Sequence, residues 1–151
     1  MIAILQRVSE AQVTVEGKCA VKIGAGFLIL LGVADGDTEE DAVLLADKIS
    51  KLRVFTDEND KLNLSVNDIG GSVLVVPNFT LLASYRKGNR PDFMQSAPPA
   101  EANRLFEYFT SYISGIVPKC EKGVFGAHME VSLINDGPIT IPMDSNVLKK
   151  H

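Results

Sequence analysis

Short apolar runs alternate with polar turns along the chain, a pattern typical of a sheet-rich fold. Strands are predicted over residues 1–8 and 11–15, the second with a period of two. The polar residues 16–18 supply a turn and residues 19–23 return, which predicts a hairpin. Residues 26–33 form a continuous apolar run, so this strand is expected to be buried on both faces.

Two amphipathic helices are predicted between the strands. Thr38 followed by Asp41 is a near match to a capping box, and apolar positions then recur at helical spacing over residues 39–53. Pro98-Pro99 suits the first turn of a second helix, whose apolar stripe ends near Gly115.

The remaining pattern predicts shorter strands and one long irregular segment. The strands are 72–76, stopped by Pro77, then 116–121, 127–134 and 139–142, with an irregular loop over 84–99, a turn at 135–138 and a frayed tail at 144–151. Because strands and helices do not alternate regularly, we expect a single α/β domain over residues 1–151. Its mixed or largely antiparallel sheet should curl like a barrel and carry two main helices.

Composition narrows the class of protein. The net charge of -4 and the pI of about 5.1 argue against broad nucleic-acid binding, but not against a grip on one RNA end by a few local cations. The longest apolar stretch is broken by glycines and is too short to span a membrane. Cys19 and Cys120 lie far apart with no export signal before them, which favours reduced thiols and a cytoplasmic protein.

Familiar catalytic patterns are missing from the sequence. His128 and His151 are the only histidines, so neither a metal site nor a cofactor is expected. Two features are unusual. One is the Pro-broken strand end at 77–81, and the other is the Asn135-Asp136-Gly137-Pro138 turn. A strand-terminating bend and an ordinary hairpin turn are the alternatives for these two, and the residues alone leave them open.

Five segments in one order carry a resemblance. They are Ile4–Val8, Gly71–Leu81, Gly88–Pro91, Gly123–Met129 and Asn135–Thr140. Together they resemble the D-aminoacyl-tRNA deacylase family from residue 1 to about residue 142. Members of that family are cytosolic homodimers that hydrolyse the ester joining a D-amino acid, or glycine mischarged on tRNA(Ala), to the 3′ end of tRNA.

The resemblance implies roles for particular residues. Phe79 and Thr80 would form the catalytic pocket with its oxyanion donors, and Asn78 and Met129 would contact the substrate. Gly137 and Pro138, joined by a cis peptide bond in the family, would enter the partner's pocket and check chirality. Arg7 would brace this turn.

The implied chemistry is consistent with the residue types. Main-chain carbonyls facing the substrate's α-carbon would exclude an L side chain whatever the D side chain is. Backbone amides at a broken strand end would stabilise the oxyanion of ester hydrolysis. Thr80 lacks a base to activate it, so attack by water, helped by the 2′-hydroxyl of the substrate, is favoured. The candidate tRNA contacts are Arg86, Lys87 and Arg90.

One departure from the family pattern keeps alternatives open. The commoner family form has Ser-Gln where this chain has Pro77-Asn78, and a related group of tRNA deacylases also has Pro at that point. One alternative is therefore a deacylase of mischarged L-aminoacyl-tRNA. The other is a noncatalytic module that binds nucleic acid or protein on the same scaffold.

Overall fold

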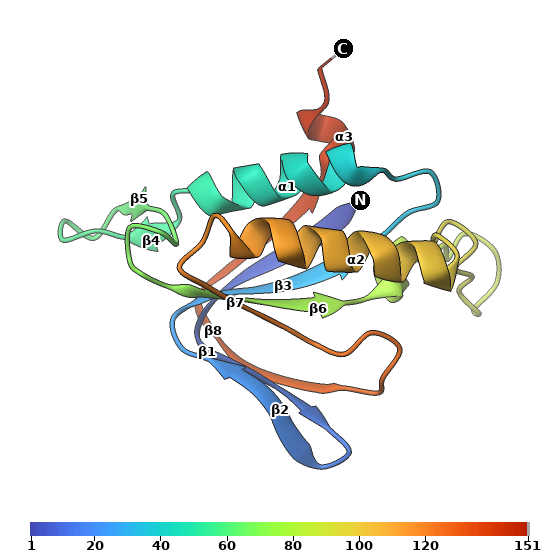
Figure 1. The fold of residues 1–151 in the computed structure, drawn as a ribbon, viewed down its shortest axis with the longest axis horizontal. Helices are drawn as coiled ribbons and strands as arrows, with labels where there is room; N and C mark the ends of the chain where they lie inside the picture. Colours follow the sequence, from blue (N-terminus) through green and yellow to red (C-terminus); the bar gives the residue numbers. More distant parts are fainter. Residues whose placement is uncertain (151) are drawn as a thin grey trace.

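The computed structural model describes residues 1–150 and shows a curled, six-stranded mixed sheet with helices on one face (Figure 1). The strands of this sheet are β1 (Ile2–Val15), β2 (Lys18–Ile23), β3 (Gly26–Gly32), β6 (Ser72–Pro77), β7 (Lys119–Lys122) and β8 (Glu130–Asp144). A small second sheet pairs β4 (Phe55–Thr56) with β5 (Leu62–Leu64). The helices are α1 (Glu39–Lys51), α2 (Pro99–Ser114), α3 (Ser145–Leu148) and the 3-10 helix η1 (Phe79–Leu82).

Strand β1 organises the sheet because it has three partners. Its first half pairs antiparallel with β3, its second half pairs antiparallel with β2, and β8 runs antiparallel to nearly its whole length. Strands β3, β6 and β7 pair parallel with one another. This mixture of directions confirms the predicted mixed sheet, and Figure 1 shows it curling below the two main helices.

Buried side chains lie on both faces of β3 and β6, as the unbroken apolar run of residues 26–33 predicted. Phe27 and Ile29 join the larger core beneath α1 and α2. Leu28 points the opposite way, because side chains alternate along a strand, and packs with Val13 and Leu74 in a second core. The curled ends of β1, β2 and β8 enclose that second core.

The two main helices begin where their capping residues predicted. The backbone amide of Thr38 donates to Asp41 Oδ2 over 2.8 Å, which completes the capping box of α1. Leu45 and Ile49 are fully buried on the inner face of α1. Helix α2 begins at Pro99 and ends before Gly115. Helix α2 lies on the same side of the sheet as α1 (Figure 1), and Leu105, Phe106 and Phe109 are among its buried residues.

Three sequence-based expectations are corrected. The two strands predicted over residues 1–8 and 11–15 are one strand, β1 (Ile2–Val15). The turn at 135–138 is an outward bulge of one continuous strand, because Asn135 pairs with Val8 and Thr140 pairs with Gln6. The frayed tail is wrong for residues 144–150, since α3 packs on α1 there, while His151 lies outside the described residues.

The tail is ordered because its polar groups have partners inside the molecule. Ser145 is fully buried, and its hydroxyl donates to Asp41 Oδ1 over 2.6 Å. Lys149 Nζ lies 2.9 Å from the same oxygen. These partners come from a helix about a hundred residues earlier, so local sequence could not reveal them.

Within residues 1–150, no helix combines the length and the apolar character needed to cross a membrane. Both cysteines are free. Cys19 is exposed, whereas Cys120 is half-buried, and burial raises the pKa of its thiol to about 11.

Candidate active site

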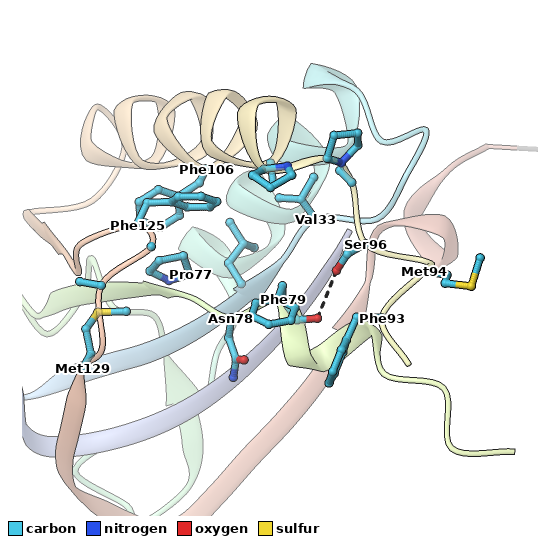
Figure 2. Close-up of a pocket in the computed structure, with 17 residues that line it drawn as sticks. Val33, Pro77, Asn78, Phe79, Phe93, Met94, Ser96, Phe106, Phe125 and Met129 are labelled. Atoms are coloured by element: carbon cyan, nitrogen blue, oxygen red, sulfur yellow. Dashed lines mark hydrogen bonds between the residues drawn. The ribbon is translucent and has the colours of Figure 1, made fainter. Parts of the chain in front are cut away.

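A cavity of about 660 Å³ opens where the parallel strands β3 and β6 end (Figure 2). Parallel neighbours finish at the same edge of a sheet, so the residues that follow β3 and β6 lie side by side there. The first turns of α2 and the connection from β7 to β8 complete the wall. The lining residues are Leu31, Val33, Pro77–Phe79, Phe93, Met94, Ser96–Pro99, Ala102, Phe106, Phe125–Ala127 and Met129.

The interior of the cavity is apolar and aromatic. The rings of Phe106 and Phe125 lie 6.2 Å apart at an angle of 43° and form part of one wall, with Val33 nearby (Figure 2). Met129 enters from the start of β8, and its sulfur accepts the amide of Val124 over 3.4 Å. A Cβ on Gly123 would lie only 2.8 Å from that sulfur, so glycine is what allows Met129 to lie across the connection.

Pro77 and Asn78 shape the mouth of the cavity. Pro77 is the last residue of β6 and has no amide proton to donate to a neighbouring strand. The amide of Asn78 still donates to Leu31 O over 2.8 Å, and its side chain then turns back to cap η1. The chain therefore leaves the sheet at a fixed point, and Phe79 stands at the rim.

Asn78 Oδ1 accepts hydrogen bonds from both donors of Thr80. It accepts the Thr80 amide over 3.2 Å and also the Thr80 hydroxyl. A hydroxyl has one proton, so a Thr80 side chain that donates to an amide oxygen has no proton left to offer a substrate. Among residues 1–150, the amide of Phe79 has no acceptor, so it is a free main-chain donor at this rim.

The aromatic ring of Phe79 is held in position but remains accessible. It meets Phe93 edge-on at 5.0 Å between centroids, and the hydroxyl of Ser96 donates to its carbonyl over 3.3 Å (Figure 2). Even so, the residue is 58% exposed. Exposed aromatic surface beside an apolar cavity is suited to a planar ligand group.

No residue that lines the cavity is acidic, basic or a thiol. His128 is not among them. Within the described part of the chain, no three His, Cys, Asp or Glu side chains gather in a way that could hold a metal ion. The polar groups available at the cavity are thus amides and one hydroxyl.

The second unusual segment lies elsewhere on the chain, at the tip of the β8 bulge. The peptide bond between Gly137 and Pro138 is cis. Arg7, only 8% exposed, donates from Nε to Asp136 O over 3.0 Å and from Nη1 to Val54 O over 3.0 Å. Its guanidinium therefore joins the bulge to the segment before β4.

Asn135 closes the neck of the same bulge. Its Nδ2 donates to Arg7 O and to Ile139 O, both over 3.0 Å, and Thr140 donates to its Oδ1 over 3.1 Å. Gly137 has a φ of 128°, and a Cβ there would lie 3.2 Å from an Arg7 terminal nitrogen. The tip is a tightly held main-chain structure, and a side chain at position 137 would be strained by both its backbone conformation and its close neighbours.

The residues proposed for the site thus fall into two groups within one chain. Asn78, Phe79 and Met129 line the cavity and Thr80 lies beside it, whereas Arg7, Gly137 and Pro138 form the separate tip. Arg7 pairs with Phe27 at the start of β3, and the cavity lies beyond the end of that strand. Arg86, Lys87 and Arg90 lie on the exposed loop between η1 and α2.

Similarity to known proteins decides the family. A family model described as "D-Tyr-tRNA(Tyr) deacylase" matches residues 4–144. The chain belongs to this family. Its deacylases are hydrolases, so both the resemblance and the expectation of an enzyme are confirmed.

Individual relatives of this deacylase family match over nearly full length. A protein of Caldicellulosiruptor saccharolyticus named "D-aminoacyl-tRNA deacylase" is 52% identical over 145 residues, covering 96% of this chain and 97% of the relative. One of the same name from Thermotoga petrophila is 51% identical over 148 residues, covering 98% and 99%.

Solved structures confirm the fold class. A "c-Myc DNA Unwinding Element Binding Protein" is 39% identical with a TM-score of 0.90, covering 95% of this chain and 98% of that one. A "probable eukaryotic D-amino acid tRNA deacylase" has a TM-score of 0.80 at 18% identity with the same coverage, a likeness of fold alone.

Sequence reasoning missed much of the cavity wall. Phe106 was assigned only to the apolar stripe of its helix, and Phe93 and Ser96 only to an irregular loop. Phe125 lies inside the Gly123–Met129 motif, which was the one local signal for it. Phe106 reaches the cavity through the core packing of α2. Phe93 and Ser96 reach it through the loop before α2, which is fixed by the bond from the Ala97 amide to Val33 O. No short segment of sequence encodes either contact.

Proposed function

We propose that this protein hydrolyses the ester bond of D-aminoacyl-tRNA and releases the free amino acid and tRNA. One observation carries the proposal: an apolar, aromatic cavity has a free Phe79 amide at its mouth and no ionisable group on its walls. Relatives that are 52% and 51% identical to this chain are named as D-aminoacyl-tRNA deacylases, which is the same class of reaction.

The cavity suits the terminal adenosine of tRNA. Aromatic side chains hold unpaired bases by stacking, and the site offers Phe79, Phe93, Phe106 and Phe125. With the base in the cavity, the 3′-ester would lie at the mouth, beside Phe79. Its carbonyl oxygen would then become negatively charged within reach of the free Phe79 amide, which is the donor we assign to the oxyanion.

Water is the nucleophile in this proposal. Thr80 donates its hydroxyl proton to Asn78, and an amide oxygen is too weak a base to activate it. With no ionisable group on the cavity wall, the 2′-hydroxyl of the substrate itself is the group placed to assist the attacking water. Thr80 then acts through its geometry, as the first turn of η1, and its oxygen remains free to accept.

Chirality would be checked by the tip of a second copy. Because the tip and the cavity lie apart in one chain, we propose a homodimer in which Gly137-Pro138 of one copy enters the cavity mouth of the other. Main-chain carbonyls facing the α-carbon would leave no space for an L side chain. Glycine has no side chain to exclude, so glycyl-tRNA mischarged on tRNA(Ala) would also be a substrate, in the cytoplasm where translation occurs.

The second candidate function is noncatalytic nucleic-acid binding on the same scaffold. The structure named for binding a DNA unwinding element, 39% identical to this chain, favours it. A deacylase of mischarged L-aminoacyl-tRNA is the third reading, and Pro77 is the residue that supports it.

The deciding experiment compares D-Tyr-tRNA with L-Tyr-tRNA, incubated with the purified protein and a chelator. We expect rapid loss of the D ester alone. Loss of both esters would mean that the protein is a deacylase that does not select for chirality. Loss of neither, from a protein shown to be a folded dimer, would leave the binding module as the function.

A further inference from the structure

The loop between η1 and α2 concentrates positive charge on an acidic protein. Arg86, Lys87 and Arg90 lie within five residues of one another, and no acidic residue interrupts them. Removing these three charges from the net charge of -4 leaves -7 on the rest of the chain. All three side chains are exposed, and within residues 1–150 none forms an ion pair. Such a patch attracts an anion against the overall field.

The loop is held at the cavity by its own hydrogen bonds. Ser84 and Asp92 exchange two main-chain bonds, over 2.8 and 2.9 Å, which close the base of the charged segment. Gln95 O accepts the amide of Asp35 over 2.8 Å. Phe93, between these ties, packs edge-on against Phe79. The base of the segment that carries the three cations is therefore fixed next to the cavity mouth.

Apolar side chains stand out from the same loop. Tyr85 is 82% exposed and Met94 is 87% exposed, and Met94 points away from the other labelled residues in Figure 2. An exposed tyrosine followed directly by Arg86 and Lys87 combines a flat stacking surface with phosphate ligands. This pairing of aromatic and cationic groups is how proteins bind single-stranded nucleic acid.

We propose that residues 84–94 bind the unpaired nucleotides that precede the terminal adenosine of the tRNA acceptor end. Tyr85 stacks on a base, and Arg86, Lys87 and Arg90 contact backbone phosphates. This inference rests on the proposed function, since it extends the strand outward from a nucleoside already seated in the cavity. It also explains how an acidic protein can act on RNA by gripping one end of it.

The test compares two substrates that share the ester but differ in the nucleotides before it. D-Tyr-tRNA has the unpaired strand, and D-Tyr-adenosine lacks it. For the variant Arg86→Gln/Lys87→Gln/Arg90→Gln we expect kcat/KM on the tRNA to fall about 10- to 100-fold at low salt. The slope of log(kcat/KM) against log[salt] should flatten by about 2, since each single-strand phosphate contact contributes about 0.7. Activity on D-Tyr-adenosine should not change.

Two further variants sharpen the result. Lys48→Gln/Lys51→Gln/Lys61→Gln removes the same charge from exposed positions on α1 and just before β5, at the other end of the molecule in Figure 1. It should leave both substrates and the salt slope unchanged. Tyr85→Ala should lower kcat/KM on the tRNA about tenfold, with Tyr85→Phe close to wild type, because the stacking needs only the ring.

Several outcomes would overturn the inference. One is equal loss on both substrates, which would place the loop in the cavity's own chemistry. Another is an equal flattening of the salt slope in the distant lysine variant, which would show that the effect depends only on the net charge of the protein. A third is dissociation of the loop variant into monomers in sedimentation, which would make the loop a contact between two copies.

Failure of the proposed function has a separate signature. If the wild type hydrolysed neither ester, anisotropy with a labelled oligonucleotide ending in CCA would still test the loop. Weaker binding by the triple glutamine variant than by the distant lysine variant would support the inference. Equal binding by both would overturn it.

Discussion

At the scale of single residues, Asn78 decides what its neighbours can do. It accepts both the amide and the hydroxyl of Thr80, so the hydroxyl proton of Thr80 is already engaged, whereas the neighbouring Phe79 amide is free. Under the proposed function, the chemistry therefore falls to the main chain and the substrate, although the segment carries a hydroxyl that resembles a nucleophile.

Thr80→Val tests this assignment. We expect kcat for D-Tyr-tRNA to fall by less than about tenfold, since the change removes one hydrogen bond worth about 1 kcal/mol. Single-turnover kinetics measure it, with Thr80→Ser as the control that keeps the hydroxyl. Complete loss of turnover, with binding and thermal midpoint intact, would instead make Thr80 the nucleophile.

Gly137→Ala tests the tip. At a φ of 128° an added Cβ would lie 3.0 Å from the Ile139 amide nitrogen and 3.2 Å from Arg7. We expect a loss of stability of about 1–2 kcal/mol in urea unfolding and a fall in D-Tyr-tRNA turnover of at least about tenfold. Gly36→Ala is the control, because it also has positive φ but open space around it. A tip variant as active as that control would remove the tip from the site.

Sequence singles out two unusual segments but not the contacts that their residues make. The motifs around Phe79 and Gly137 stand out as segments, and the family resemblance links them. The bond from Asn78 back to Thr80 depends on a side-chain rotamer, and the contact of Arg7 with Asp136 joins residues 129 positions apart. Neither is encoded in spacing along the chain.

At the scale of elements, Asp41 joins α1 to the end of the chain. Burial alone would raise the pKa of its carboxyl. Hydrogen bonds from Ser145 and Thr38, together with Lys149, outweigh that effect and lower the pKa from 3.8 to about 2. The ionised carboxylate is thus the form that holds α3 in place.

The pH dependence of stability follows from that shift. A lowered pKa means that Asp41 stabilises the fold above about pH 4, and that this contribution disappears as the pH falls through about 2. We expect Asp41→Asn to lower the free energy of unfolding by about 2 kcal/mol at neutral pH, and by much less near pH 2. Urea titrations across this range measure it.

Glu40→Gln is the matched control for that experiment, because its carboxylate is exposed on the same helix. It should lose almost no stability at any pH. If the difference in unfolding free energy between Asp41→Asn and wild type stayed constant down to pH 2, the shape of the side chain, rather than its charge, would hold α3.

Elements differed in how well sequence predicted them. The main helices α1 and α2 were predictable because their apolar spacing and first-turn residues agree. The short helix α3 was not, since four residues have no period, and its stability comes from Asp41. The bulge of β8 was mistaken for a turn because a Gly-Pro pair has the same composition in both.

At the scale of the whole molecule, the tip and the cavity lie apart within one subunit. If two copies exchange tips, a subunit with a blocked cavity and a subunit with a damaged tip should restore each other. Ala127→Trp would place a large side chain on the cavity wall, and Gly137→Ala would alter the tip.

Co-expression of these two impaired variants should yield about a quarter of wild-type activity, since half of the dimers would be mixed and each would have one complete site of two. Deacylation of D-Tyr-tRNA by the purified mixture measures it. A mixture no more active than its parents would show that the tip does not act across a dimer.

Strand β1 connects these two regions and fixes their separation. Ala3 pairs with Leu31, which lines the cavity, and Arg7, four residues later, holds the tip. At about 3.3 Å per residue, this segment of β1 holds the two regions about 13 Å apart along the strand, and its pairing with β3 and β8 keeps that distance fixed. Shortening it by one residue would do more than move the tip closer. It would turn every following side chain to the opposite face of the sheet. The spacing between cavity and tip therefore cannot change by one residue without also turning Arg7 away from the tip.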